Sequence, residues 1–329
     1  MRSKARRSLL LAVALVAAGA LLWLHVRQPA PTRNPGRQAT GRAPAAQQAG
    51  VIASTQPAVA VPSAVLPVSD AIRPILGLGQ ESPAVRWAAV RALGTRLNQA
   101  ERTALYDYLR GHELDPPGPM RGVIKNDVIL ALKSQEPPPK ELAGVLLSMF
   151  HDQAQDPVIR NYALQHLGTW YERVAEKTQV LDALWAGTGD IDASIQGTAL
   201  IALGRLVQGN ASSEPPPAGY ANGGGQLDVT RLTLVASTLA TDSVANDVAR
   251  LTALQVCAEL GIKEALPTAV SLAEGAASTP LRMSAVAAVG ALGGPEQAPL
   301  LNRLVAADDP RIQTAARAAL RRLEARRSG

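Results

Sequence analysis

The segment Asp156–Gly168 reads DPVIRNYALQHLG, and variants of it recur at six other places in the 329-residue chain. We count positions from Arg160, which is position zero. The other zero positions are Arg86, Lys125, Gln196, Arg250, Arg282 and Gln313. In all seven copies, positions −1, +3 and +7 hold an aliphatic residue, except for Cys257 at one +7 position. Because these positions share one side of a helical wheel, each copy predicts a helix with a wide apolar face.

A second, shorter apolar helix is predicted before each copy. These helices are expected over residues 72–78, 100–109, 140–151, 174–186, 227–240, 264–274 and 297–306. Successive zero positions lie 39, 35, 36, 54, 32 and 31 residues apart, and all but one of these spacings suit a repeat of two helices. The spacing of 54 contains residues 209–226, whose Pro and Gly runs predict a loop insertion. The sequence therefore predicts an all-α solenoid of about seven helical hairpins over residues 68–329.

The pattern Asp-Pro-x-[Val/Ile]-Arg-x-x-Ala-[Leu/Val]-x-x-Leu-Gly resembles the HEAT-like repeat, in particular the short variety found in phycobilin lyases. The resemblance covers about 260 of the 329 residues, although Lys125, Gln196 and Gln313 replace the Arg of the pattern. It implies a right-handed α-solenoid. It also implies that the helix containing Arg160 lines the concave surface, with its shorter partner on the convex one.

The N-terminal segment has a different composition from the repeats. Residues 1–67 contain eight Lys or Arg and no Asp or Glu, and an apolar run of sixteen residues, Leu9–Leu24, follows four basic residues. This pattern predicts a signal anchor over residues 1–27 that places the repeats on the periplasmic side of the inner (cytoplasmic) membrane. A cleaved signal peptide, with release to the periplasm, is the alternative. Residues 28–67, rich in Pro and Ala, predict a disordered linker.

The net charge of the repeats argues against nucleic-acid binding. The chain has 33 basic and 27 acidic side chains, of which residues 1–67 hold eight basic ones. Residues 68–329 therefore carry 33 − 8 = 25 basic and 27 acidic side chains, a net charge of −2. A protein that binds phosphate backbones is expected to carry its positive charge on the folded part.

No catalytic constellation is found in the sequence. The four histidines, His25, His112, His151 and His166, have no metal-ligand spacing, and Cys257 occupies a core position. No nucleophile elbow, phosphate loop or zinc-protease motif occurs. We therefore expect no enzymatic activity, no cofactor and no metal site.

The arginines at the zero positions, Arg86, Arg160, Arg250 and Arg282, lie within the apolar arc and need a partner. Three carboxylates, Asp156, Asp192 and Asp309, lie four residues before a zero position, in the turns between paired helices. A structural ladder of Arg–Asp bonds between successive units is therefore predicted. The alternative is that these arginines bind an anionic ligand.

Positions +1, +2 and +5 point away from the apolar arc and are bulkier in the N-terminal half. The candidate protein-binding surface consists of Trp87, Arg91, Asn126, Tyr162, Gln165 and Trp170, because Trp, Tyr and Arg are the residue types that anchor interfaces. In the alternative interpretation, Trp87 and Tyr162 pack on a neighbouring helix.

These features together predict a membrane-anchored, non-catalytic scaffold that binds protein partners in the periplasm and binds no nucleic acid. This interpretation depends partly on an analogy between folds. One alternative is an accessory or lyase-like subunit of an enzyme system, as the phycobilin-lyase resemblance suggests. A nucleic-acid-binding HEAT-like protein is the other, less favoured one.

Overall fold

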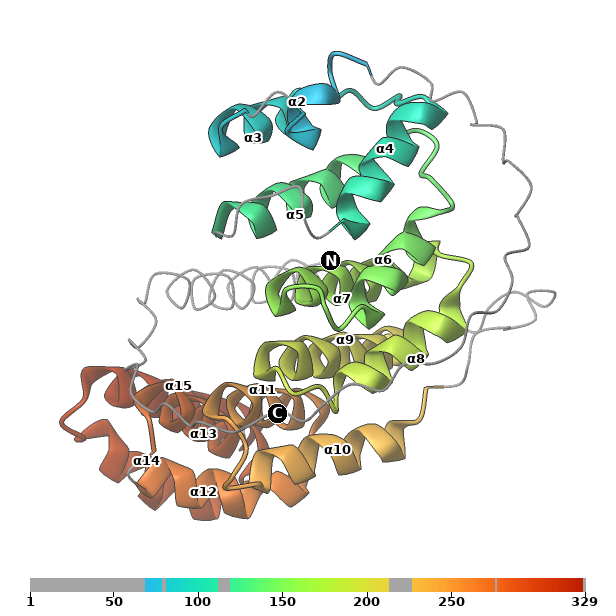
Figure 1. Ribbon diagram of the computed structural model, residues 1–329. Helices are drawn as coiled ribbons and strands as arrows, with labels where there is room; N and C mark the ends of the chain where they lie inside the picture. The colour runs from blue at the N-terminus through green and yellow to red at the C-terminus, as the bar shows by residue number, and fades with distance from the viewer. Residues whose placement is uncertain (1–68, 79–80, 112–118, 213–226, 276, 328–329) are drawn as a thin grey trace, which may run out of the picture. The chain divides into compact units, whose positions relative to one another are not determined.

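The computed structural model describes residues 69–78, 81–111, 119–212, 227–275 and 277–327. Within these ranges the chain forms fourteen α-helices and three short 3₁₀ helices, and no strand (Figure 1). All of them belong to one compact unit, Val68–Gly329. The predicted anchor and linker, and residues 213–226 of the predicted insertion, lie outside the described residues. The predicted all-α repeat architecture is confirmed.

Even-numbered and odd-numbered helices alternate along the chain. The even-numbered helices are α2 (Arg73–Leu76), α4 (Gln99–Arg110), α6 (Leu142–His151), α8 (Lys177–Gly187), α10 (Val229–Thr241), α12 (Leu266–Glu274) and α14 (Ala298–Val305). The odd-numbered helices, each containing one zero position, are α3 (Pro83–Arg91), α5 (Pro119–Lys133), α7 (Pro157–Trp170), α9 (Ala193–Ser212), α11 (Asp247–Leu260), α13 (Thr279–Leu292) and α15 (Pro310–Arg327). Each even-numbered helix packs against the odd-numbered helix that follows it, which gives seven pairs.

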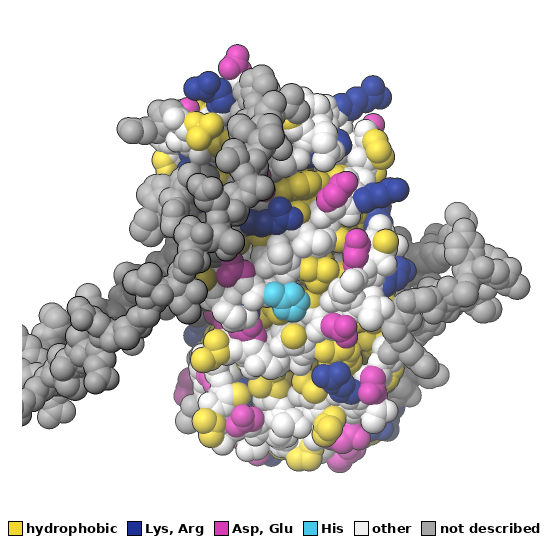
Figure 2. Space-filling view, turned by 45° about the vertical axis from the view of Figure 1, so that its right-hand side comes forward, with side chains coloured by type: hydrophobic (Ala, Val, Ile, Leu, Met, Phe, Trp, Pro, Cys, Tyr) yellow, Lys and Arg dark blue, Asp and Glu magenta, His cyan; other side chains and the backbone are white. Residues whose placement is uncertain are grey.

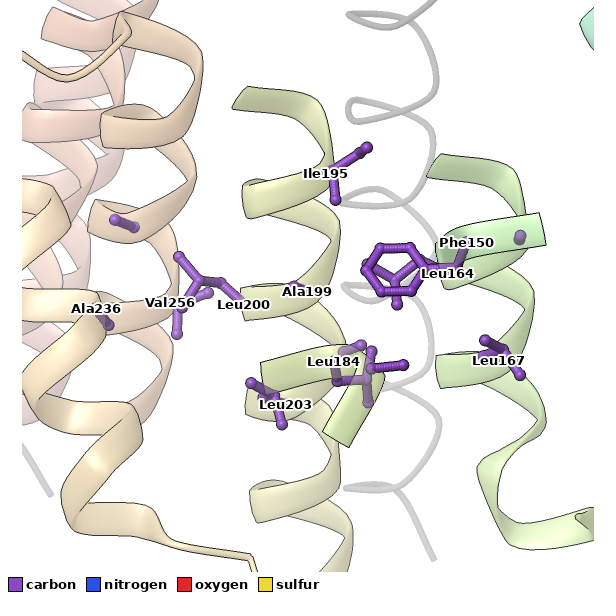
Figure 3. Packing of buried hydrophobic residues seen from close by; sticks show 14 of the residues in the cluster. Phe150, Leu164, Leu167, Leu184, Ile195, Ala199, Leu200, Leu203, Ala236 and Val256 are labelled. Atoms are coloured by element: carbon purple, nitrogen blue, oxygen red, sulfur yellow. The ribbon is translucent and has the colours of Figure 1, made fainter. Parts of the chain in front are cut away.

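The odd-numbered helices form one continuous layer, because each packs against the next from α3 to α15 (Figure 1). Their −1, +3 and +7 side chains supply the core of this layer, as predicted; Ile159, Ala163 and Leu167 of α7 are at most 1 % exposed. In Figure 3, Leu200 of α9 and Val256 of α11 point toward each other between their helices. The first and last repeats have one neighbouring repeat instead of two, so the side chains at these positions are less buried there.

The ends of the shorter helices agree with the predicted ranges to within three residues. Helix α9 continues to Ser212, four residues into the predicted insertion. Helix α2 is a single turn that ends at Gly77, whose φ of 70° is left-handed and suits glycine. Helices α3, α7 and α15 begin with an N-cap, because the side chains of Ser82, Asp156 and Asp309 accept hydrogen bonds from main-chain N–H groups in the first turn.

The zero-position side chains bind the end of the preceding helix in the same pair. Five of them donate to main-chain carbonyls in or just beyond the last turn of that helix. The bonds are Arg86 Nη2 to Ile75 O (2.7 Å), Lys125 Nζ to Leu109 O (2.9 Å), Arg160 Nε to Phe150 O (3.0 Å), Arg282 Nε to Ala273 O (2.8 Å) and Gln313 Nε2 to Ala307 O (2.8 Å). The last carbonyls of a helix have no partner within it, so these donors satisfy them, and cations also suit the helix dipole. The zero position is thus a C-terminal capping position.

This arrangement corrects the predicted Arg–Asp ladder. Asp156 and Asp192 accept hydrogen bonds from N–H groups at the start of their own helices, at 2.8 Å each. A buried Arg–Asp ion pair between units joins Arg160 Nη2 to Asp190 Oδ2 at 2.5 Å, and Asp190 was not among the predicted carboxylates. The reason is geometric: capping holds the predicted carboxylates at their own helices, while the carbonyls of the paired helix lie within reach of position zero.

Asp309 makes a different kind of bond between units. Its Oδ2 accepts from the Thr279 hydroxyl of the preceding unit at 3.2 Å. Its closest cation is Arg311, at 2.9 Å. Hydrogen bonds from the Arg311 side chain and main chain lower the pKa of Asp309 to about 2. Asp309 therefore stays ionised, paired within its own helix start rather than with a zero-position arginine.

Candidate functional site

Five of the six candidate surface residues are at least partly accessible on α3, α5 and α7. Arg91 and Gln165 are exposed, and Trp87, Asn126 and Tyr162 are half-buried. The sixth, Trp170, is wrongly predicted, because it is 5 % exposed and belongs to the hydrophobic core. As the last residue of α7 it packs inward, and Lys133 Nζ lies 5.7 Å from its ring centroid.

Hydrogen bonds between side chains join α3, α5 and α7. Trp87 Nε1 donates to Asp127 Oδ2 at 2.7 Å, and Asn126 Nδ2 lies 3.3 Å from Asp127 Oδ1. On the other side of α5, His166 Nε2 lies 2.9 Å from Asn126 Oδ1, and Lys133 Nζ lies 3.4 Å from His166 Nδ1. We call these five residues the polar network. It fixes three successive repeats to one another.

The protonation of His166 sets the direction of the hydrogen bonds. Burial, and secondarily the charge of Lys133, lower the pKa of His166 to about 4, so the ring is neutral at pH 7. Asn126 Oδ1 can only accept, so the ring proton is on Nε2, and Nδ1 accepts from Lys133. Donation therefore runs from Lys133 through His166 and Asn126 to the carboxylate of Asp127. With both ring nitrogens engaged, His166 is not available as a general base.

The charged ends of the polar network are partly shielded from water. Burial, and then the charge of Arg173, lower the pKa of Lys133. Lys133 Nζ also lies 3.3 Å from Thr169 Oγ1. Tyr162 lies beside α5, since a Cβ added to Gly122 would be 3.5 Å from its ring, and burial followed by the charge of Asp127 raises its pKa. Trp87 and Tyr162 thus contact the neighbouring helix, as the alternative interpretation proposed.

Beside the polar network, the +5 positions of the same helices are open to solvent. We call Arg91, Leu130 and Gln165 the +5 strip; all three are exposed, Leu130 by 48 %. The Arg91 guanidinium lies 5.0 Å from the centroid of the Trp87 ring, which orients its charge. In later repeats the exposed +5 residues Ala287 and Ala318 are small. The strip therefore combines a cation, an aliphatic side chain and an amide on three adjacent repeats.

The sequence located the +5 strip but not the polar network. The network includes Asp127 and Lys133 of α5 and His166 of α7. These side chains come together only because of how the two helices are placed. The sequence did hold one signal for this network, namely the adjacent polar residues Asn126 and Asp127 at the +1 and +2 positions. Two polar side chains that face the next repeat need hydrogen-bond partners there.

Other reactive side chains were also located. Cys257 is buried in the core, where burial raises the pKa of its thiol to about 12, so the thiol is protonated. Over residues 69–327, apart from the short gaps in the description, no three His, Cys, Asp or Glu side chains could hold a metal ion together. Within the same residues, no helix has the length and apolarity needed to cross a membrane.

Comparison with known proteins agrees with the repeat pattern. A family model described as HEAT repeats matches residues 239–321, so the predicted resemblance to HEAT repeats is confirmed over these residues. No curated protein matches the chain. A solved structure of human deoxyhypusine hydroxylase in complex with glycerol is similar, with 18 % identity over 78 % of this chain and 95 % of that one, at a TM-score of 0.33. A similarity at that level supports no conclusion about activity.

Proposed function

We propose that this chain, with HEAT repeats over residues 239–321 and the same two-helix pattern from residue 69 onward, is a non-catalytic scaffold that binds a protein partner. HEAT repeats generally mediate protein binding. The observation that carries the proposal is the +5 strip, where Arg91, Leu130 and Gln165 are exposed on adjacent repeats. Arginine beside an aromatic ring is a common interface anchor.

The distribution of charge supports a protein partner over a nucleic acid. Residues 68–329 have a net charge of −2. On the face drawn in Figure 2, acidic, basic and apolar side chains are interspersed and no continuous basic stripe occurs. A surface of this kind suits a specific protein contact, in which a few anchors are surrounded by mixed polar groups.

We also propose that residues 1–27 anchor the chain in the inner membrane, with the repeats in the periplasm. The support is the four basic residues before the run Leu9–Leu24. The right-handed sense of the solenoid likewise stays a prediction. A reporter fused after Gly329 should be active outside the cytoplasm, and extraction should require detergent. A soluble form that begins within residues 28–67 would contradict the anchor.

A matched pair of photo-cross-linking variants tests the binding surface. Gln165 and Gln255 are both exposed glutamines at the +5 position, one in the third repeat and one in the fifth. A photoreactive amino acid is placed at either position, and the cells are irradiated. Because the strip lies in the N-terminal half, we expect a discrete protein adduct from position 165 and none from position 255.

The charge of the strip gives a second test. Arg91→Glu reverses an exposed charge and should abolish the adduct at position 165 without changing the melting temperature. Equal adducts at positions 165 and 255 would contradict the proposed surface, and an adduct that survives Arg91→Glu would show that Arg91 is not an anchor.

A further inference from the structure

Arg250 is a zero-position side chain without the usual capping bond. Its Nε is buried and has no hydrogen-bond partner among the described residues. Its Nη1 lies 3.8 Å from Asp247 Oδ1, on the same helix, and the Arg250 side chain is only 11 % exposed. A buried guanidinium nitrogen without a partner loses free energy relative to water. This position therefore lacks an acceptor.

The hydrogen bonds at the end of α10 come from local donors. Thr241 Oγ1 donates to Ser237 O at 3.0 Å and to Thr238 O at 2.9 Å, and Asp242 N donates to Thr238 O at 3.0 Å. In the next repeat the corresponding Arg282 Nε reaches Ala273 O at 2.8 Å. Among the described residues, Arg250 makes no corresponding bond to the end of α10.

Arg250 lines a cavity of about 550 Å³. The other polar lining comes from hydroxyl side chains: Thr241 and Ser243 at the end of α10, and Thr268 and Ser271 of α12. Leu272 contributes an apolar wall, and no carboxylate is part of the lining. A cavity of this size is in the range of small-molecule sites.

We propose that this cavity binds a small phosphorylated molecule, with its phosphate group on Arg250. Arginine presents a fork of donors that matches phosphate oxygens. A phosphate group offers three acceptor oxygens, which suits a guanidinium surrounded by hydroxyls better than a planar carboxylate does. The phosphate would accept from the Nη groups of Arg250, because Nε has almost no surface open to the cavity.

Asp247, whose carboxylate lies close to Arg250, has another partner. Asp247 Oδ2 accepts from the Ser278 hydroxyl of the following repeat at 2.5 Å. Asp247 is 48 % exposed, so water screens its repulsion of an anion. It therefore orients Arg250 at the long distance of 3.8 Å without neutralising it.

Binding of phenyl phosphate to the full-length chain in detergent tests the proposal, measured by calorimetry at constant ionic strength. We expect saturable binding with one site. Arg250→Gln should weaken it at least ~10-fold, since a charge-assisted hydrogen bond is lost. Arg86→Gln is the matched control: it changes the zero-position arginine of the first repeat, which does not line the cavity, and should change affinity less than ~2-fold. Arg250→Lys keeps the charge and loses the fork, so it should bind with intermediate affinity.

Benzoate and inorganic phosphate define the ligand class. Benzoate should bind far more weakly than phenyl phosphate, and inorganic phosphate should compete with it. The proposal is overturned if phenyl phosphate does not bind, if benzoate binds equally well, or if Arg250→Gln and Arg86→Gln weaken binding to the same extent. Ser271→Ala provides a variant that leaves Arg250 in place, and unchanged affinity there would exclude α12 from the site.

Discussion

The N-terminal and C-terminal repeats join their odd-numbered helices in different ways. Between α3, α5 and α7, the polar network connects the helices through side-chain hydrogen bonds, such as that from Trp87 to Asp127 at 2.7 Å. Between α13 and α15 the residues are small, and a Cβ added to Gly290 would lie 2.5 Å from Ala319 Cβ. One repeat pattern therefore supports both polar bridging and close apolar contact.

This difference decides which changes each half tolerates. Polar bridges depend on protonation and on the presence of every donor and acceptor. Close contacts between small residues depend on volume, because a packed interior responds even to one added methyl group. In a solenoid each repeat contacts mainly its neighbours, so local hydrogen exchange can report the two halves separately.

The largest effect is expected from Arg160→Ala. The substitution leaves the Asp190 carboxylate, 8 % exposed, without its cation and Phe150 O without its donor. Breaking a buried ion pair costs about 3–5 kcal/mol. We expect this loss in the free energy of unfolding, together with faster hydrogen exchange in α6 and α7 but unchanged exchange in α13.

Arg303→Ala is the control for this prediction. The Arg303–Glu274 pair is as short, 2.5 Å, but both side chains are exposed, by 65 % and 49 %. An exposed pair contributes under about 1 kcal/mol. Equal destabilisation by the two substitutions would contradict the structural importance of the buried pair.

A smaller loss is expected from Gly290→Ala in the C-terminal half. The new Cβ would also lie 2.6 Å from Ala319 Cα, so α13 and α15 must move apart. Overpacking of this kind costs about 2–3 kcal/mol. Gly144→Ala in α6 is the matched control, because nothing lies within 4 Å of its added Cβ, and it should stabilise the protein by about 0.5–1 kcal/mol. Equal unfolding midpoints would disprove the close contact.

The periodicity of the sequence predicted the fold because the same buried positions recur in every repeat, and each depends only on nearby residues. Positions −1, +3 and +7 depend only on helix geometry, and they are buried in the middle repeats, as at Ile195, Ala199 and Leu203. The N-caps at Ser82 and Asp156 were predictable for the same reason, since a cap and its N–H group are three residues apart or closer.

The partners of the zero-position side chains were not predictable in this way. Whether Arg160 meets a carboxylate or a carbonyl depends on where α6 ends relative to α7, which the pattern does not encode. Similarly, nothing in the sequence separates Arg250, whose Nε has no acceptor among the described residues, from Arg282, whose Nε donates to Ala273 O. Contacts between elements therefore required the structure.

The polar network predicts a pH dependence in the N-terminal half. The folded-state pKa of His166, about 4, lies below its ordinary value of 6.5, so the unfolded chain takes up the proton first. The stability that neutral His166 contributes is complete above pH 6.5 and is lost as the pH falls toward 4. At pH 5 the loss is on the order of 2 kcal/mol, by the conversion of 1.36 kcal/mol per pKa unit. Unfolding between pH 5 and 7.5 measures it.

Two histidine variants distinguish this contribution from general acid sensitivity. His166→Gln keeps a side chain that can donate and accept but cannot titrate, so the pH dependence of α5 and α7 should flatten. His151→Gln, at an exposed histidine, should leave it unchanged. If hydrogen exchange in α13 becomes faster at pH 5 to the same extent as in α7, the dependence does not come from the polar network.

The smallest effect is expected from Trp87→Phe, which keeps an aromatic ring and removes only the Nε1 donor to Asp127. Because Asp127 is half-buried and retains Asn126 as a donor, water and Asn126 offset part of the loss. We expect a loss of about 1 kcal/mol, below the range of about 1.5–3 kcal/mol for hydrogen bonds to charged groups. The double variant Trp87→Phe with Asp127→Asn should be less destabilised than the sum of the single variants, since both changes remove the same bond. Additive losses would show that Trp87 stabilises α3 only by packing, and the N-terminal repeats would then be joined, like the C-terminal ones, by apolar contact.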